Sequence, residues 1–467
     1  MTTPSGPSRR QAGIALAGLW FVVVLAIGDA GDLTTESSRM LAIFGAAVVL
    51  WVTEAIPLSA TSIMVILAEI LLVSDEAIVA TSEGFDAPPY SGFFATLAHP
   101  VLMLFLGGFV LADAAAKFRL DRNLAGVMLK PFGQSPRSIL AGLMTITAVL
   151  SMFMSNTATT AAMIAVVLPV TARLERDDPI RTALVLAVPV AANIGGLGTP
   201  VGSPPNAIAL GRLADEGISI DFLKWMMLAV PIMLVVLVFG WLLLTRLYPA
   251  NATTVDVRVG GEFDRSGHAQ ILYVVFAMTI LGWITEPLHG IPSAVVGFVP
   301  VVVLLTTNVI GVDDLQKINW HVLWLVGGGI ALGNGVGATG LDDWLVALFD
   351  WGSLSTAILA AALALLALTM STLISNSATA NLMVPIGVSL AMSPAVDLDP
   401  VLAGVIVALS CSLAMGLPIS TPPNAIAYAT GSIQPRDLAR TGITIGLFGL
   451  VLVVVIAPPI WDRLGLL

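Results

Sequence analysis

Residues 155–159 read SNTAT and residues 375–379 read SNSAT, so one short polar phrase occurs twice in a strongly apolar chain. A second phrase follows each of them: residues 203–208 read SPPNAI and residues 421–426 read TPPNAI. Proline breaks helices, and Ser, Thr and Asn side chains compete for backbone hydrogen bonds. Four such interruptions are hard to explain as packing. Their repetition predicts one polar site that is built from two copies of a half-protein.

The composition places most of the chain in lipid. Hydrophobic residues make up 57% of the 467 residues, charged residues make up 11%, and the mean hydropathy is +0.95. Soluble domains carry about 25% charged residues. The first apolar stretch, 13–28, follows Arg9 and Arg10, but no convincing cleavage site comes after it, so we interpret it as a span and not as a signal peptide.

We therefore expect an all-α polytopic membrane protein with about eleven transmembrane helices and two re-entrant helical hairpins. The candidate spans are 13–28, 40–56, 58–73, 100–116, 182–194 with 204–213, 223–246, 269–286, 291–310, 321–338, 400–416 with 424–431, and 441–460. The hairpins are the apolar stretches 138–172 and 354–390, each broken at its centre by a Ser-Asn phrase. Irregular backbone at membrane depth is tolerated only where it is buried in protein or lines a wet cavity.

The distribution of basic residues supports this topology. If the chain starts inside and both broken stretches are re-entrant, 16 of the 20 Lys and Arg residues fall in cytoplasmic segments. Arg258 is one of these 16 residues. The exceptions are Arg39, Arg212, Lys224 and Arg463. The outer loops are acidic, including the segment that ends at Asp350. Cytoplasmic loops of membrane proteins carry an excess of Lys and Arg, so the pattern predicts a cytoplasmic N-terminus in the cell's cytoplasmic membrane.

The halves repeat beyond the polar phrases. Residues 51–54 (WVTE) match residues 283–286 (WITE), and residues 106–108 (LGG) match residues 326–328 (VGG). In the expected topology the first hairpin opens to the cytoplasm and the second to the outside, so the copies are inverted. Inverted repeats with broken helices that meet at the midplane are typical of secondary transporters.

The four phrases suit an anion and small cations together. A helix begins after each hairpin tip, and its free backbone N–H groups and positive dipole end favour an anion such as a carboxylate. Hydroxyl, amide and carbonyl oxygens favour a small hard cation such as sodium, and the proline and glycine breaks free carbonyls for this purpose. An anion and cations bound side by side reduce one another's desolvation cost.

Other classes of function find little support. There is no Walker-type loop for ATP, no metal-ligand spacing among the four histidines, and a single cysteine, Cys411. An intramembrane enzyme would need a Ser–His or paired-Asp arrangement at midplane positions, and the sequence shows none. A single Ser-Asn-Thr is usually a helix–helix contact, but two pairs of matched phrases argue against that interpretation. We expect structural roles for Glu54, Glu286, His99 and His321.

The paired Ser-Asn phrases, the paired Pro-Pro-Asn phrases and the WVTEAIP sequence at 51–57 resemble the divalent anion/sodium symporter family, the solute carrier 13 group. The resemblance covers nearly the whole chain. It implies a homodimer, a fixed scaffold and a mobile transport domain that moves like an elevator. Substrates in the family are C4 dicarboxylates, tricarboxylates or sulfate, and sodium ions are co-transported without an organic cofactor.

The resemblance also implies site residues at the matching motif positions. The first sodium site would use Ser151, Ser155, Asn156 and the backbone around Gly202. The second would use Ser371, Ser375, Asn376 and the backbone of Ile374 and Ser420. The substrate would meet Asn156, Thr157, Ser203 and Pro204 from one half and Asn376, Ser377, Thr421 and Pro422 from the other. Ser377 stands where many members have Thr, which keeps the hydroxyl and loses a methyl group.

The sequence thus predicts a sodium-coupled carrier of a di- or tricarboxylate, with succinate as the model substrate, and no enzyme. A sodium-independent dicarboxylate exchanger, a sodium/sulfate symporter and a channel stay open as alternatives. We expect mainly scaffold in 1–137, transport domain in 138–268, scaffold again in 269–353, and transport domain in 354–467. The expected partners are a small anion, the lipid bilayer and a second copy of the chain.

Overall fold

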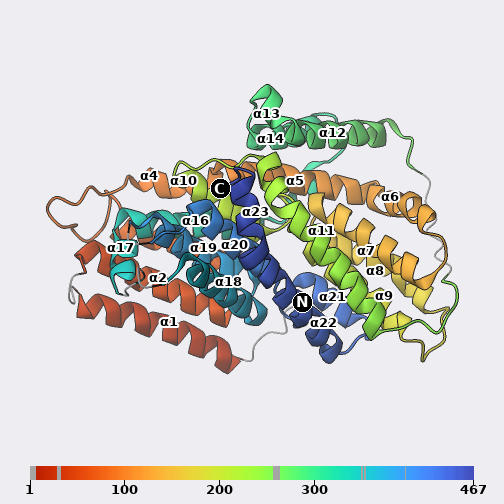
Figure 1. Ribbon diagram of the computed structural model, residues 1–467. Coiled ribbons are helices and arrows are strands. Elements are labelled where there is room, and N and C mark those ends of the chain that lie inside the picture. Colours follow the sequence, from red (N-terminus) through yellow and green to blue (C-terminus); the bar gives the residue numbers. More distant parts are fainter. Residues whose placement is uncertain (1–6, 29–32, 256–262, 349–350, 352–353, 395) are drawn as a thin grey trace.

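The computed structural model describes residues 7–28, 33–255, 263–348, 351, 354–394 and 396–467. All regular secondary structure in these residues is helical. Within these ranges nine helices are long and apolar enough to cross a membrane. This confirms the expected all-α polytopic class (Figure 1). Arg258 and Asp350, which the charge pattern assigned to a cytoplasmic and an outer segment, lie outside the described residues.

The first half begins with helical elements each of which contacts the next. Their bounds are α1 (Pro7–Ile27), α2 (Thr35–Thr53), α3 (Leu58–Leu72), α4 (Tyr90–Ala95), η1 (Thr96–Ala98), α5 (Pro100–Lys117), α6 (Leu120–Leu129) and η2 (Lys130–Phe132). Helix α2 begins earlier than the predicted residue 40 because the polar groups of its first turns have hydrogen-bond partners. Thr34 Oγ1 accepts from Ser37 N at 3.1 Å, and the Arg39 guanidinium donates to the Leu72 and Ala80 carbonyls at 3.0 and 2.7 Å.

Each predicted hairpin is a pair of helices with a break at the Ser-Asn phrase. The first consists of α7 (Pro136–Phe153) and α8 (Asn156–Thr171), and the second of α18 (Thr356–Leu373) and α19 (Asn376–Met392). Met154 and Ile374 are extended, with φ and ψ of −128° and 161° and of −122° and −177°. The serine that follows is also outside the helical region, with φ and ψ of −57° and 128° at Ser155 and of −72° and 146° at Ser375, so two residues separate the helices of each hairpin.

The Pro-Pro-Asn phrases begin short helices after unwound segments. Helix α9 (Ile180–Gly195) is followed by α10 (Pro204–Asp215), and α20 (Pro400–Ser412) by α21 (Pro422–Ala429). Proline at the first helical position costs no hydrogen bond, which explains why both helices start there. The remaining elements are α11 (Phe222–Leu247), α12 (Gly267–Ile284), α13 (Glu286–His289), α14 (Ser293–Thr306), α15 (Val312–Gln316), α16 (Trp320–Ala338), α17 (Leu341–Ala347), α22 (Pro435–Val451), a π-helical turn (Leu452–Ile456) and α23 (Ala457–Arg463).

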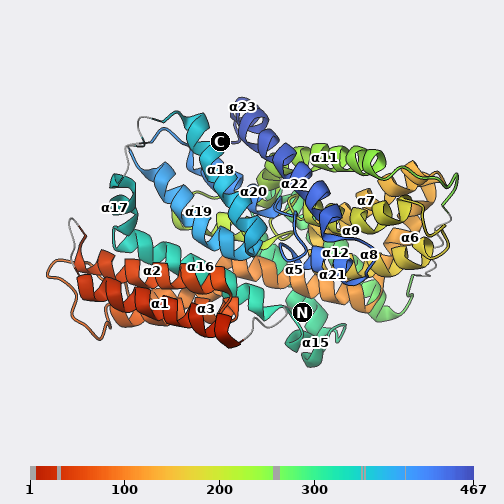
Figure 2. The same ribbon diagram turned by 90° about the horizontal axis from the view of Figure 1, so that it is seen from below.

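Helices of the two halves cross over one another. Helix α10 packs against α19 and α20, and α21 packs against α8 and α9. Each Pro-Pro-Asn helix therefore lies on the hairpin of the other half. Helix α16 packs on α3 on one side and on α10 and α19 on the other (Figure 2), while α12 lies beside α14, which packs on α5.

Glycines let these helices approach closely. A Cβ at Gly107 of α5 would come within 1.7 Å of the Gly297 carbonyl of α14, and one at Gly328 of α16 within 2.2 Å of the Ser62 side chain of α3. Small residues at helix contacts are typical of membrane proteins, in which close packing holds helices together. The repeated Gly-Gly pairs thus fix α5 and α16 against their neighbours.

Candidate functional site

A serine one turn before each hairpin tip gathers oxygen atoms. Ser151 Oγ lies 2.5 Å from Asn156 Oδ1 and 2.8 Å from the Ala192 carbonyl oxygen. A serine hydroxyl carries one hydrogen, so at most one of these two acceptors receives it. The cluster thus holds three close oxygens and one hydroxyl hydrogen, and the Ala192 carbonyl also accepts from Gly196 N at 3.0 Å. Such an acceptor-rich cluster suits a small hard cation.

The second half repeats this cluster. Ser371 Oγ lies 2.8 Å from Asn376 Oδ1 and 2.8 Å from the Cys411 carbonyl oxygen. Ser151 and Ser371 are both fully buried. Over the part of the chain that the structure describes, no group of three or more His, Cys, Asp or Glu side chains is placed to hold a metal. The oxygens of the two clusters are neutral. Neutral oxygens suit a monovalent cation that binds reversibly and is released again.

The tips also touch the unwound segments. A Cβ at Gly196 would come within 2.5 Å of Asn156 Nδ2, and a Cβ at Gly202 within 2.7 Å of the Gly196 carbonyl oxygen. Glycine is therefore required at both positions. The contacts bring Asn156 and the backbone around Gly202 together, as the first predicted sodium site needs.

Hydroxyls tie each hairpin to the unwound segment of its own half. Thr199 Oγ1 donates to the Met152 carbonyl, and Ser420 Oγ donates to the Thr372 carbonyl at 2.8 Å. Ser420 is thus next to the second tip, but its hydroxyl is engaged by the hairpin backbone. The role of its backbone carbonyl in a sodium site stays a prediction.

The asparagines of the Pro-Pro-Asn phrases hold the unwound segments in shape. Asn206 Nδ2 donates to the Gly196 and Thr199 carbonyls at 2.9 and 2.8 Å. Asn424 Nδ2 donates to the Met415 and Leu417 carbonyls, both at 2.9 Å. Each amide closes a loop of backbone whose carbonyls have lost their helical partners. Both asparagines are fully buried, so the shape of each break depends on them.

Two side chains that sequence reasoning missed join the halves. Asn193 Nδ2 lies 3.2 Å from Thr421 Oγ1 and 3.2 Å from Asn424 Oδ1. In the corresponding place of the other half, Ser412 Oγ donates to Ser203 Oγ at 3.2 Å. Both are polar residues at the end of an apolar helix, just before the break. An alignment of the residues that precede the two breaks would have identified Asn193 and Ser412 from the sequence.

The predicted substrate residues differ in exposure. Asn156, Asn376 and Ser377 are half-buried and Thr157 is exposed, all in the first turn of α8 or α19. Ser203 and Thr421 are buried, at 4% and 3% exposure, and sit at the N-caps of α10 and α21. The remaining predicted positions lie beside them: Pro204 is half-buried, Pro422 is exposed, and Ser155, Ser375 and Ile374 are half-buried at the tips.

Glu54, His99 and His321, and also His289, lie at helix ends or join neighbouring helices. Glu54 ends α2 in the left-handed region with φ of 48°. His99 caps α5, since its Nδ1 accepts from Val101 N at 3.3 Å. His321 Nδ1 lies 2.6 Å from Ser59 Oγ, and His289 Nε2 lies 2.9 Å from the Gly282 carbonyl. None of these groups reaches the hairpin tips.

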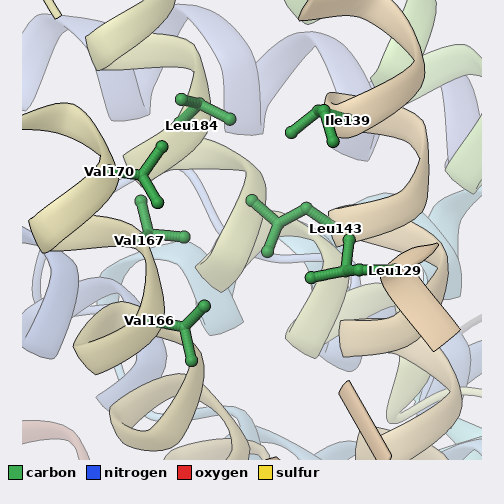
Figure 3. Close-up of a pocket in the computed structure, with 7 residues that line it drawn as sticks. All are labelled: Leu129, Ile139, Leu143, Val166, Val167, Val170 and Leu184. Carbon is green, nitrogen blue, oxygen red and sulfur yellow. The ribbon is translucent and has the colours of Figure 1, made fainter. Parts of the chain in front are cut away.

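A small gap between α6, α7, α8 and α9 is separate from the tips (Figure 3). Its volume is about 10 Å³ and its walls are purely apolar. The lining residues are Leu129, Ile139, Leu143, Val166, Val167, Val170 and Leu184. A space of this size and chemistry suits no polar ligand, and we interpret it as a packing gap in the first hairpin.

Comparisons with known proteins identify the family of the chain. Residues 10–467 match the family described as "Sodium:sulfate symporter transmembrane region". The sodium-dependent dicarboxylate transporter SdcS of Staphylococcus saprophyticus is 29% identical over 96% of this chain and 91% of its own length. SdcS of Staphylococcus aureus strain bovine RF122 is 29% identical over 95% of this chain and 90% of its own.

Two solved structures share the fold. The Alcanivorax borkumensis YdaH transporter aligns with a TM-score of 0.54 at 13% identity, over 87% of this chain and 98% of that one. Neisseria gonorrhoeae MtrF aligns with a TM-score of 0.55 at 11% identity, over 94% and 97%. The family match spans nearly all of the chain, so the protein is a multi-pass membrane transporter, not an enzyme, and belongs to the sodium:sulfate symporter family, the divalent anion/sodium symporters.

Proposed function

We propose that the protein couples the inward movement of sodium ions to the uptake of a C4 dicarboxylate such as succinate across the cytoplasmic membrane. The observation that carries this proposal is the pair of acceptor-rich clusters at Ser151 and Ser371. Anion transport alone gives no reason to bury two matched sets of three oxygens, each with a single hydroxyl hydrogen. The names of the staphylococcal relatives favour a dicarboxylate over sulfate.

The two asparagines link cation and substrate. Asn156 and Asn376 turn Oδ1 toward the serine clusters. An asparagine amide has two hydrogens on Nδ2, which are suited to a carboxylate, while the backbone N–H groups of the first turns of α8 and α19 add further donors. A cation held at Oδ1 orients the amide and lowers the cost of placing an anion at Nδ2. Sodium and carboxylate therefore favour each other's binding.

We place the site in a transport domain made of residues 138–268 and 354–467, which slides as an elevator against a scaffold made of the remaining helices. The packing supports this division, since the crossed contacts of α10 with α19 and of α21 with α8 tie the two hairpins into one body. We also propose a homodimer with cytoplasmic N-termini and hairpins inserted from opposite faces, as the charge pattern indicates.

Uptake by the purified protein in liposomes tests the proposal. We expect accumulation of labelled succinate with an inward sodium gradient and none with potassium in its place. Citrate, α-ketoglutarate and sulfate are offered as competitors, and succinate competes best. Succinate counterflow in sodium-free liposomes would support the exchanger instead, and sulfate as the preferred solute would support the sulfate carrier.

A further inference from the structure

The buried amide of Asn193 reaches from the first half into the second. Its side chain is 3% exposed, and its Nδ2 is close to both Thr421 Oγ1 and Asn424 Oδ1. The orientation of the amide is fixed. Asn424 donates both Nδ2 hydrogens to carbonyls, so its Oδ1 faces Asn193. Asn193 therefore turns Nδ2, and not Oδ1, toward Asn424, because two amide oxygens would repel each other.

This contact uses the second lone pair of the Thr421 hydroxyl. Thr421 Oγ1 accepts from the Asn424 backbone N–H at 3.3 Å as the N-cap of α21, and it accepts from Asn193 Nδ2 at 3.2 Å. A hydroxyl oxygen has two lone pairs and one hydrogen. With both lone pairs occupied, Thr421 can offer a ligand only its hydrogen.

The corresponding hydroxyl of the first half is less constrained. Ser203 accepts from Ser412 Oγ, but it makes no side-chain cap bond to α10. One lone pair of Ser203 thus stays available as well as its hydrogen. Asn193 has two hydrogens on Nδ2, one for Thr421 Oγ1 and one for Asn424 Oδ1. Ser412 has a single hydroxyl hydrogen, which it donates to Ser203 Oγ. This explains why Asn206 Oδ1, which corresponds to Asn424 Oδ1, is buried without a partner.

We propose that Asn193 is a positioning residue that commits the Thr421 hydroxyl to donation and so makes the two ends of the substrate site chemically unlike. The Thr421 end takes an ionised carboxylate, which can only accept hydrogen bonds. The Ser203 end takes either an ionised carboxylate or a group that carries a hydrogen, such as a protonated carboxyl. The proposal rests on dicarboxylate transport, and it deepens that function by giving the substrate one preferred orientation.

A double-mutant cycle in liposomes tests this role. Asn193→Leu keeps the volume and removes both donors; we expect the KM for succinate to rise about tenfold, the effect of one lost hydrogen bond, with Vmax within about twofold. Thr421→Val raises the KM to a similar extent. Because Asn193 acts on the substrate through Thr421, Asn193→Leu adds little to the KM in the Thr421→Val background.

Two further variants separate positioning from packing. Ser410→Ala on α20 is the matched control, since its buried hydroxyl has no partner and its loss should leave KM and Vmax unchanged. Ser412→Ala should raise the KM less than Asn193→Leu does. If Asn193→Leu does not purify as a single species, Asn193→Ala replaces it, because water can then fill the space beside Asn424.

The outcomes distinguish this inference from the function on which it rests. Absence of sodium-driven succinate uptake by the wild-type protein contradicts the proposed function. Wild-type uptake together with fully additive effects of Asn193→Leu and Thr421→Val on KM contradicts the inference alone. An unchanged KM in Asn193→Leu does the same.

Discussion

Asn381 of the second hairpin donates from Nδ2 to the Leu325 carbonyl of α16 at 2.9 Å, and both groups are buried. The amide lies on a glycine: a Cβ at Gly329 would come within 2.0 Å of Asn381 Oδ1. In the proposed two-domain arrangement, this bond joins the transport domain to the scaffold. A movement of α19 along α16 would have to break it.

The first prediction concerns Gly329. We expect Gly329→Ala to lower the melting temperature in detergent, because the added methyl displaces Asn381 and overpacking of this kind costs about 1–3 kcal/mol. Gly18→Ala in α1 is the control, since no atom lies within 4 Å of the added Cβ. The double variant Gly329→Ala/Asn381→Ala should recover part of the loss. A wild-type melting temperature for Gly329→Ala would contradict the close contact.

The second prediction concerns the two serine clusters. Ser151→Ala and Ser371→Ala each remove one oxygen of a proposed cation site. We expect the sodium concentration for half-maximal succinate uptake to rise about tenfold or more in each, in line with the loss of a hydroxyl ligand. Sodium also stabilises a protein that binds it only when folded, by about 2.7 kcal/mol at a hundred times Kd. The variants should therefore lose part of the rise in melting temperature that sodium gives.

The control for both serine variants is Ser355→Ala, which removes an exposed hydroxyl that caps no backbone group. It should keep the wild-type sodium dependence. If Ser151→Ala and Ser371→Ala also keep it, the clusters serve the fold and the cations bind elsewhere.

The third prediction compares the two buried asparagines of the breaks. Asn424→Ala removes two donors and also leaves Asn193 without one acceptor, whereas Asn206→Ala removes only two donors, because Asn206 Oδ1 has no partner. Both variants should be destabilised. Asn424→Ala should be the less stable by about 1 kcal/mol, the net value of one hydrogen bond. Equal melting temperatures would show that the contact with Asn193 contributes nothing to stability.

The sequence was enough to predict much of this arrangement because the decisive residues break a strong pattern. The two Ser-Asn phrases predicted a hairpin broken at each phrase, and the structure has a break there between α7 and α8 and between α18 and α19. Helix-breaking residues act locally, so their positions can be read from the sequence without knowledge of the tertiary contacts.

The contacts between the halves could not be predicted in this way. Asn193 is one polar residue in an apolar helix, and its role depends on where α21 lies in space. The predicted start of α2 was wrong for a related reason, since the carbonyls that accept hydrogen bonds from Arg39 cannot be identified from the sequence. Single polar residues in apolar helices acquire meaning from partners far away in the sequence.

The fourth prediction concerns the opposite insertion of the two hairpins. Glu175 lies in the exposed turn after α8 and Asp397 in the exposed turn after α19. In a Cys411→Ala background, which removes the one buried native thiol, Glu175→Cys should react with an impermeant maleimide only from the cytoplasmic side and Asp397→Cys only from outside. Labelling in intact cells and in inverted vesicles measures this. Reaction of both cysteines from the same side would contradict inverted hairpins, because each turn marks the side to which its hairpin returns, and the repeat would then be parallel.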